Sequence, residues 1–518
     1  MPTSDQPALA HRFADRFPEL SVAHDAAPTQ HRTLLALNEP LAAELGLDPD
    51  WLRTDAGVRL LTGEAPGPHA RPVAQGYAGH QFGGYSPVLG DGRALLLGEL
   101  NRPSAREPSR ADTGLTDLVD LHLKGSGRTP FSRPGSDGLA AVGPMLRELV
   151  IGEALHAIGV PTTRALAVVA TGVTVQRDRP LPGAVLSRTA ASHLRVGTFQ
   201  YAAALAHQRS QQGDDASDLV ARLVDESLRR HHPAADPGLD SPVSERARAL
   251  LAAVVRSQAE LVTRWMLIGF VHGVMNTDNM TISGESIDFG PCAFMEAFDP
   301  DAVFSSIDRA GRYAFGNQPA AAQWNLTRFA ETLLPLLAGT TEAAVEIAQD
   351  ELAGFARHQS RAWLDGLRAK LGLGAAAAVD DAQVGGLADR LFPLLAEHGV
   401  DWTAFWANLA DLAPGDDRPQ VAVDAGPFVP VPAALQTWYD EWASLGPDRE
   451  AMRRANPRRI PRNRPLDAAL TSAEAGDLAD VERILAAVRD PFTPRADAPD
   501  LERPASPDAG PFVTYCGT

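Results

Sequence analysis

A short polar stretch followed by an Asp-Phe-Gly tripeptide carries the residues of this sequence best suited to catalysis. The stretch reads His272-Gly-Val-Met-Asn-Thr-Asp-Asn279, and the tripeptide begins at Asp288. In kinase-type phosphate-transfer sites one loop supplies a base and an Asn, and a second loop supplies an Asp. The Asn and the Asp hold Mg²⁺ against the nucleotide phosphates. Asn279 and Asp288 follow this order, so we predict that both are metal ligands.

The base of that pattern is missing from its usual place. Kinase-like enzymes with a His-Gly-Asp-x-x-x-x-Asn sequence carry the base five residues before the Asn, where this chain has Val274. Valine cannot accept a proton, and the nearest carboxylate is that of Asp278. Asn276 and Asp278 could instead be turn residues that bond their own backbone, and Asp-Phe-Gly alone is a common turn sequence. Upstream elements have to decide between these interpretations.

A lysine at the end of a predicted strand is the first such element. Residues 118–123 predict a strand ending at Lys124, where a kinase places the lysine that grips nucleotide phosphates. Such a lysine needs a carboxylate on a following helix to hold it. The apolar spacing over residues 146–158 predicts this helix. Glu148 is the expected partner of the lysine and Glu153 the alternative.

Two glycine-rich segments flank this lysine. Before it, the Asp91-Gly92 pair between apolar runs predicts a hairpin, in which Gly90 and Gly92 let the backbone approach phosphates and Arg93 adds charge. After it, residues 125–138 form a polar loop whose amides and guanidinium groups suit anionic oxygens. A plain turn and a surface loop are the alternatives.

Two arginines stand near the place where a kinase has a neutral hinge. Strands predicted at 165–170 and 183–188 would complete a small sheet, and Arg188 and Arg195 follow where this sheet should meet the helical part. Arginines there would crowd an adenine but bind phosphates with bidentate contacts. They are either ordinary surface residues or an additional phosphate pocket.

Composition limits the class of protein. The 518 residues suffice for two or more packed units, and the net charge of −18 argues against nucleic acid or an anionic membrane as the main partner. The chain has no run of eighteen apolar residues and no apolar signal sequence, so we expect no membrane span and a cytoplasmic enzyme. With Cys292 and Cys516 as its two cysteines, it has no disulfide framework.

The order of these elements makes the sequence resemble the selenoprotein O family of kinase-fold protein adenylyltransferases. The resemblance covers nearly the whole chain. The stretches that carry it are Tyr77-Ala-Gly-His-Gln-Phe-Gly, Lys124-Gly-Ser-Gly-Arg-Thr-Pro, His272-Gly-Val-Met-Asn-Thr-Asp-Asn, Ile287-Asp-Phe-Gly-Pro, Gly311-Arg-Tyr-Ala-Phe-Gly-Asn-Gln-Pro and Ala473-Glu-Ala-Gly-Asp-Leu-Ala-Asp-Val-Glu-Arg.

The resemblance implies that ATP binds in a flipped orientation and that AMP is transferred to Ser, Thr or Tyr hydroxyls of proteins, with Mg²⁺ or Mn²⁺ as the metal. By position, Lys124 paired with Glu148 would hold the inverted phosphates together with Arg188 and Arg195, and Asp278 would be the base. Asn279 and Asp288 would bind the metal, and Asp288 would also contact the nucleotide. The residues that would complete the nucleotide pocket are Gly90, Gly92, Arg93, Asp137 and Gly138.

The patterns and the resemblance together predict an α+β, protein-kinase-like bilobal fold. We expect an N-terminal extension over 1–75, a sheet-bearing lobe over 76–195, a helical lobe over 196–415, and a C-terminal helical extension with a tail over 416–518. Within the N-terminal extension, the spacing over 34–46 predicts a helix that ends at a glycine.

The sequence leaves alternatives open for the function and for the role of Cys516. The same residues would serve a conventional ATP-dependent kinase of proteins or small molecules, although Val274 counts against it, or a non-catalytic nucleotide-binding pseudokinase. Family members end in a selenocysteine or cysteine, and Cys516 matches that place, which implies redox control, with Cys292 as the one available pairing partner. Two free thiols are the alternative. The Pro- and Asp-rich stretch before Cys516 predicts a mobile tail.

Overall fold

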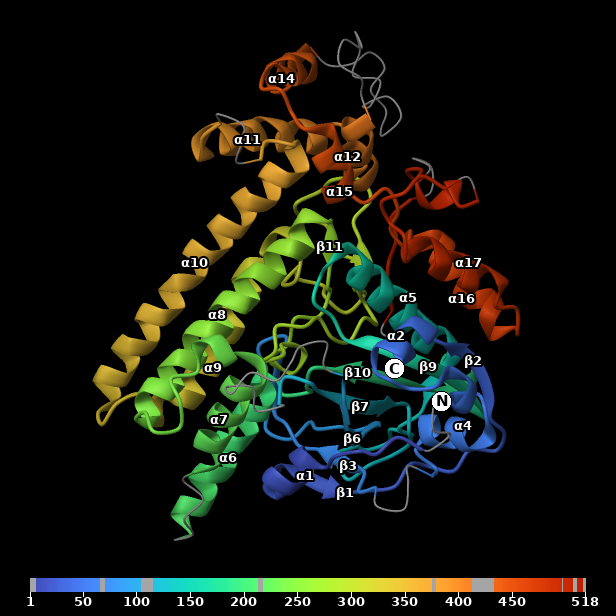
Figure 1. Cartoon of the computed structure of the whole chain (residues 1–518), viewed down its shortest axis with the longest axis vertical. Coiled ribbons are helices and arrows are strands. Elements are labelled where there is room, and N and C mark those ends of the chain that lie inside the picture. Colours follow the sequence, from blue (N-terminus) through green and yellow to red (C-terminus); the bar gives the residue numbers. More distant parts are fainter. Residues whose placement is uncertain are drawn as a thin grey trace.

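The computed structural model has an α+β architecture, with one antiparallel sheet region and a larger helical region (Figure 1). No helix among its described residues is long and apolar enough to cross a membrane. The described residues are 6–65, 70–103, 115–212, 218–374, 379–411, 433–495, 497–505 and 510–515.

The described residues form one eight-stranded sheet in which seven strands follow the order β1-β3-β6-β7-β10-β9-β2 and β8 pairs with β10. The predicted strands around 118–123, 165–170 and 183–188 are confirmed, the latter two as a long hairpin. The strands are β1 (Ser21–Ala23), β2 (Thr33–Leu37), β3 (Val73–Gln75), β6 (Ala94–Asn101), β7 (Leu118–Lys124), β8 (Ala140–Ala141), β9 (Arg164–Gln176) and β10 (Pro180–Ala190).

Helices cover both faces of the sheet. Successive side chains of a strand point to opposite faces, and accordingly Leu96 packs in the core that contains α5 (Val142–Ile158), while Leu97 packs with α4 (Asp55–Thr62). The predicted helix over 146–158 is therefore confirmed as part of α5. Because α5 packs against one face of the sheet, its residue Glu148 lies next to Lys124 at the end of β7.

Two local predictions are wrong. Residues 34–46 are not one helix, because Thr33–Leu37 pairs with β9 as strand β2 and the helix α2 (Glu39–Glu44) starts only after the capping residue Asn38. The tight hairpin is not at Asp91-Gly92 but between β4 (Gly79–Gln81) and β5 (Gly84–Ser86). Pairing with a neighbouring strand outweighed helical spacing in the first case. In the second case, the Asp91 carboxylate accepts the backbone N–H of Gln75, the last residue of β3. Asp91 thus joins the end of β3 to the segment before β6 instead of forming a hairpin turn.

A bundle of long helices follows the sheet and lies beside it in Figure 1. Its helices are α6 (Val196–Gln211), α7 (Leu219–His231), α8 (Val243–Leu267), α9 (Gln318–Leu337) and α10 (Thr341–Leu371). The last residues of this bundle before the loop at His272 belong to α8. This bundle shares one hydrophobic core with α5, so sheet and bundle are packed against each other.

The C-terminal residues form two further groups of helices. One, with a second core built around Trp402, Trp406 and Trp442, contains α11 (Asp381–Glu397), α12 (Trp402–Asp411), α14 (Ala433–Ser444) and α15 (Arg449–Ala455). The other, α16 (Asn463–Glu474) and α17 (Ala479–Val488), packs on α5. The expected boundary at 415/416 and Cys516 lie outside the described residues. The predicted N-terminal extension supplies two edge strands of the sheet.

Candidate active site

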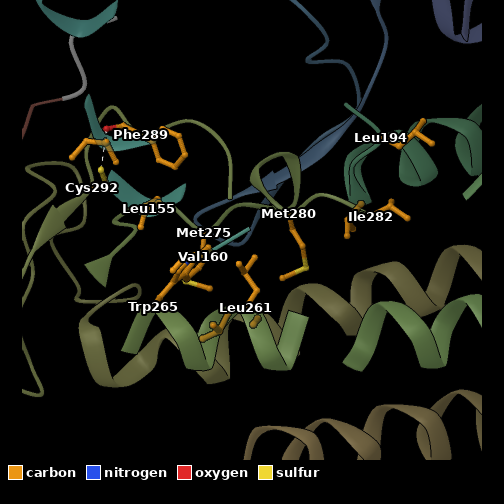
Figure 2. Close-up of a cluster of buried hydrophobic side chains, with 14 of the residues drawn as sticks. Leu155, Val160, Leu194, Leu261, Trp265, Met275, Met280, Ile282, Phe289 and Cys292 are labelled. Atoms are coloured by element: carbon orange, nitrogen blue, oxygen red, sulfur yellow. Dashed lines mark hydrogen bonds between the residues drawn. The ribbon is translucent and has the colours of Figure 1, made fainter. Parts of the chain in front are cut away.

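The loop that carries the predicted catalytic residues is anchored by apolar side chains. It leaves β11 (Phe270–Val271) and returns at β12 (Ala293–Phe294), and the two strands pair with each other. Met275, Met280 and Phe289 are buried in the core that α8 lines (Figure 2). The His272 ring donates from Nε2 to the carbonyl of Ile287 at 2.8 Å. The two halves of the predicted site are thus fixed relative to each other.

Asp278 lies in a short 3₁₀ turn (Thr277–Asn279) and is almost fully buried. Its Oδ2 accepts a hydrogen bond of 3.2 Å from Nε2 of Gln81, while its Oδ1 has no partner among the described residues. Burial, only partly offset by the nearby Arg195, raises the pKa of Asp278 to about 6. Gly79 is required beside it, because a Cβ there would lie 2.9 Å from Oδ1. A buried carboxylate with one free oxygen is suited to accept a proton.

The β4–β5 hairpin is hydrogen-bonded to this turn. Asn276 Oδ1 accepts the backbone N–H of Phe82 at 3.0 Å and the hydroxyl of Tyr313 at 2.8 Å. The Thr277 hydroxyl accepts the backbone N–H of His80 at 2.7 Å. Asn276 is therefore not merely a turn residue that bonds its own backbone, since its side chain joins three segments that are far apart in the sequence.

Asp288 is the point where three cationic side chains meet. Its carboxylate lies 2.6 Å from Nζ of Lys124, 2.8 Å from a guanidinium nitrogen of Arg188 and 3.4 Å from one of Arg195. Burial alone would raise the pKa of Asp288, but the charges of these three residues outweigh it and hold the pKa well below its ordinary value. Asp288 has a φ of 65°, which is rare for a residue other than glycine and typical of strained functional sites.

The partner of Lys124 is Glu148, as predicted. Its Nζ lies 2.6 Å from Oε1 of Glu148, which also accepts the backbone N–H of Phe289 at 3.1 Å. The alternative, Glu153, is instead engaged by Arg164 at 2.7 Å and by Arg489 at 3.3 Å. Glu148 thus links the lysine at the end of β7 to the Asp-Phe-Gly segment.

A cavity of about 860 Å³ opens beside these groups. Its volume suits a nucleotide-sized ligand. Most of the predicted site residues line it: Gly90, Gly92, Arg93, Lys124, Asp137, Arg188, Arg195, Asp278, Asn279 and Asp288.

Two of the predicted residues do not line the cavity. Glu148 lies behind Lys124, and Gly138 shapes the loop after β7, since a Cβ there would overlap the backbone of Gly127 at 2.2 Å. That loop is ordered over the cavity rather than free on the surface. The Thr129 hydroxyl donates to the carbonyl of Asp91 at 2.6 Å, and Phe131 fills the space in which Gly90 would need a Cβ.

Sequence reasoning missed several residues of the cavity. Asp137 is paired with Arg177 at 2.8 Å, and Arg177 follows the last residue of β9, where no local pattern marks it. The guanidinium of Arg195 lies 4.6 Å from the ring centre of Tyr77, which orients it by a cation–π contact. Gln81 and Tyr77 stand in the conspicuous Tyr77-to-Gly83 stretch, so their position near glycines and aromatic residues could have identified them.

The chemistry of the donors fits a hard divalent cation. Asn279 donates from Nδ2 to the carbonyl of Val274 at 2.9 Å, and this orientation leaves its amide oxygen available as a ligand in the cavity that Asp288 also lines. Within the described ranges no group of three or more His, Cys, Asp or Glu side chains could hold a metal by itself. An ion bound here would take further ligands from phosphates and water, as Mg²⁺ commonly does.

Cys292 is buried, and its thiol donates to the carbonyl of Phe289 at 3.2 Å (Figure 2). Burial raises the pKa of Cys292 to about 12, so the thiolate is scarce at neutral pH. The described part of the tail is not free, contrary to the prediction of mobility: Thr514 is buried and donates its hydroxyl to the carbonyl of Pro291 at 2.6 Å. Cys516 lies outside the described residues, so its pairing with Cys292 stays a prediction.

Comparison with known proteins identifies close relatives. The family model described as "Protein adenylyltransferase SelO" matches residues 7–489. The chain is 53% identical over 514 residues to a protein of Mycolicibacterium paratuberculosis, covering 99% of this chain and 98% of that protein. It is 52% identical to one of Mycobacterium sp. (strain KMS), covering 99% of each. It is 49% identical to one of Cereibacter sphaeroides (strain KD131 / KCTC 12085), covering 95% and 96%. All three relatives are named "Protein nucleotidyltransferase YdiU".

Proposed function

The chain belongs to the SelO family of protein adenylyltransferases and is a nucleotidyltransferase, and on that premise we propose that it transfers AMP from ATP to Ser, Thr or Tyr hydroxyls of proteins. In this proposal ATP lies in a flipped orientation, with its triphosphate at the buried end of the cavity. The sheet and the helical bundle would then be the two lobes of a protein-kinase-like fold, with the nucleotide between them.

The single observation that carries the flipped orientation is the convergence of three buried cations on Asp288. Lys124, Arg188 and Arg195 are all largely buried, and their three positive charges exceed the two negative charges of Asp288 and Glu148, with which they pair. An adenine there would have to displace or stack on charged side chains, whereas phosphate oxygens match both guanidinium groups. Apolar side chains line the cavity elsewhere, at Leu89, Phe131 and Leu139.

In the proposed reaction the acceptor oxygen attacks the α-phosphorus in line with the leaving pyrophosphate. The bond between the α-phosphorus and the bridging oxygen breaks, and the acceptor proton passes to the carboxylate of Asp278, which lines the cavity. Lys124, Arg188 and Arg195 neutralise the charge that develops on the leaving pyrophosphate. Asn279 and Asp288 would hold Mg²⁺ or Mn²⁺, which supplies additional charge neutralisation at the phosphates.

Two other functions are less well supported. A conventional kinase would need a base at residue 274, and Val274 is buried and apolar. A non-catalytic nucleotide-binding protein would not need Lys124, Glu148 and Asp288 together. Here Lys124 forms ion pairs with both carboxylates, and Glu148 also accepts the backbone N–H of Phe289. The small product decides between the three functions: our proposal requires pyrophosphate, a kinase releases ADP, and a binding protein releases neither.

Replacing Arg188 and Arg195 together by Ala should weaken ATP binding more than AMP binding. AMP lacks the two phosphates that these guanidinium groups are proposed to hold, and hydrogen bonds to charged groups contribute about 1.5–3 kcal/mol each. We therefore expect the Kd for ATP to rise by roughly two orders of magnitude, with a much smaller change for AMP. Titration calorimetry of both nucleotides measures this difference.

A matched control for this experiment is the double substitution Arg246→Ala with Arg248→Ala. Both arginines lie on α8 away from the cavity, so their loss changes the net charge equally without touching the site. Equal losses of ATP and AMP affinity in the Arg188 and Arg195 variant would contradict the flipped orientation. Such a result would not decide whether the protein transfers AMP.

A further inference from the structure

Exposed apolar side chains gather around the mouth of the cavity. Seven of the nine large apolar residues that are exposed within the described ranges lie on three segments: the β4–β5 hairpin and the residues after it, the loop over 303–307, and the tail over 513–515. The other two are Val22 and Leu239. The seven are Phe82, Tyr85, Val88, Val303, Ile307, Val513 and Tyr515.

The tail is hydrogen-bonded to the loop over 303–307, and the hairpin packs on Tyr313, whose backbone N–H bonds Asp308, the residue after that loop. The Phe82 ring lies 5.2 Å from that of Tyr313, and both residues bond the same Oδ1 of Asn276. The tail lies alongside the loop, since Thr514 donates its backbone N–H to the carbonyl of Phe304 at 2.8 Å. Phe82 and Ile307 also line the cavity that contains Asp278. Two of the seven exposed apolar residues therefore lie at the cavity that contains Asp278.

The backbone of Phe82 adds an independent observation. It has a φ of 50° in the turn of the β4–β5 hairpin and is followed by Gly83 with a φ of 87°. Such a turn is relaxed with Asn-Gly, whereas a bulky residue with positive φ costs about 1–2 kcal/mol. The Phe82 side chain is nevertheless 36% exposed and recovers only part of this cost by packing on Tyr313. Strain of this kind at a mouth of a cavity points to binding.

We propose that Phe82 and Ile307 bind an apolar side chain of the substrate protein, next to the hydroxyl that accepts AMP. The partner is an extended polypeptide segment in which an apolar residue lies one or two positions from the acceptor. The inference rests on the proposed function, because it places the acceptor hydroxyl at Asp278. Gln81, the residue before Phe82, donates to Asp278, so the two sites are within the reach of neighbouring residues in an extended chain, which rises about 3.3 Å per residue.

The adenine of ATP is the other apolar group that could contact Phe82. Phe82 lies at the acceptor side, where its N–H bonds Asn276, whereas Phe131 lies beside Gly90 in the glycine-rich turn. We therefore assign the Phe82 surface to the protein substrate, and the test below separates the two.

The test uses short synthetic peptides with a central Ser, Thr or Tyr, identical except that the residues flanking the hydroxyl are either Leu or Ser. With α-labelled ATP, the wild-type protein should label the Leu-flanked peptides with about tenfold higher kcat/KM. Phe82→Asn should remove this preference mainly by raising KM for the Leu-flanked peptides. Its Kd for ATP should stay at the wild-type value. Leu239→Asn, an equally apolar-to-polar exchange at an exposed position away from the cavity, should keep the preference.

Stability separates binding from simple packing. Because Asn adopts positive φ readily, Phe82→Asn should melt no lower than the wild type. A lower melting temperature with an unchanged peptide preference would make Phe82 a packing residue and overturn the proposal. A raised Kd for ATP in Phe82→Asn would assign Phe82 to the adenine. If the wild-type protein labelled itself but none of the peptides, the proposed binding of substrate at Phe82 and Ile307 would also be contradicted. Absence of all labelling, including self-labelling, would instead refute the proposed function.

Discussion

Asp288→Asn should lower the rate of AMP transfer by about 10³-fold or more, since it removes the carboxylate proposed to hold the metal against the phosphates. The substitution keeps the size of the side chain and tolerates the φ of 65° at this position, so the backbone should not change. The rate of pyrophosphate release at saturating ATP measures the effect. A well-folded Asp288→Asn protein with a rate near that of the wild type would remove Asp288 from the site.

Asp288→Asn should still bind ATP when no metal is present. In the nucleotide-free protein Asp288 forms ion pairs with Lys124, Arg188 and Arg195, so it competes with the phosphates for these cations. Removing its charge should leave the Kd for ATP in EDTA unchanged or lower it, while the stability of the free protein at neutral pH should decrease. The decrease follows from the depressed pKa of Asp288: the stability that its ionised form contributes is present above the unfolded-state pKa and is lost as pH falls.

Asp278→Asn should lower the rate of transfer by about 10²-fold or more, because the amide cannot accept the proton of the attacking hydroxyl. ATP binding should persist, since the carboxylate of Asp278 makes no ion pair with Lys124, Arg188 or Arg195 among the described contacts. Single-turnover labelling under saturating ATP isolates the chemical step. If titration calorimetry showed that ATP binding was lost, Asp278 would be a nucleotide or metal ligand instead of a base.

The effect of Asp278→Asn on stability should have the opposite sign to that of Asp288→Asn. Burial raises the pKa of Asp278 from 3.8 to about 6, so the ionised carboxylate destabilises the metal-free fold above that pH. Urea unfolding in EDTA should show the variant to be more stable than the wild type at about pH 8, by up to about 3 kcal/mol. The two proteins should converge only below about pH 3, where Asp278 is protonated in both the folded and the unfolded state. A wild-type protein that is more stable at about pH 8 would contradict the assigned burial of this carboxylate.

The residues that meet at the cavity could be predicted from the sequence because their spacing along the chain reflects local structure. Lys124 ends a strand, Glu148 lies in the next helix, and Asp288 begins a tripeptide a short loop after Asn279. Each of these relations involves one element and its neighbour, so strand and helix patterns were sufficient. The choice of Glu148 over Glu153 needed the structure, since both lie on α5 and only the packing of that helix decides which one faces Lys124.

Residues whose roles depend on distant contacts could not be found in this way. Arg177 follows β9 and reaches Asp137 only because the loop after β7 folds back over the cavity. Thr514 meets Pro291 across more than two hundred positions of sequence, a contact that the Pro- and Asp-rich composition of the tail could not reveal. Likewise, the apolar run at 34–37 became a strand because β9 offered it a partner. In each case tertiary contacts outweighed the local pattern.

The position of the label that becomes protein-bound tests the central proposal most directly. The purified protein would be incubated with Mg²⁺ or Mn²⁺ and ATP labelled in parallel at the α- or the γ-phosphate, with Asp278→Asn as a control that keeps the nucleotide site. We predict that label from α-labelled ATP alone becomes attached to protein, together with release of pyrophosphate, and that the control attaches little. Protein-bound label from γ-labelled ATP alone, with ADP as the product, would contradict AMP transfer and make this protein a conventional kinase.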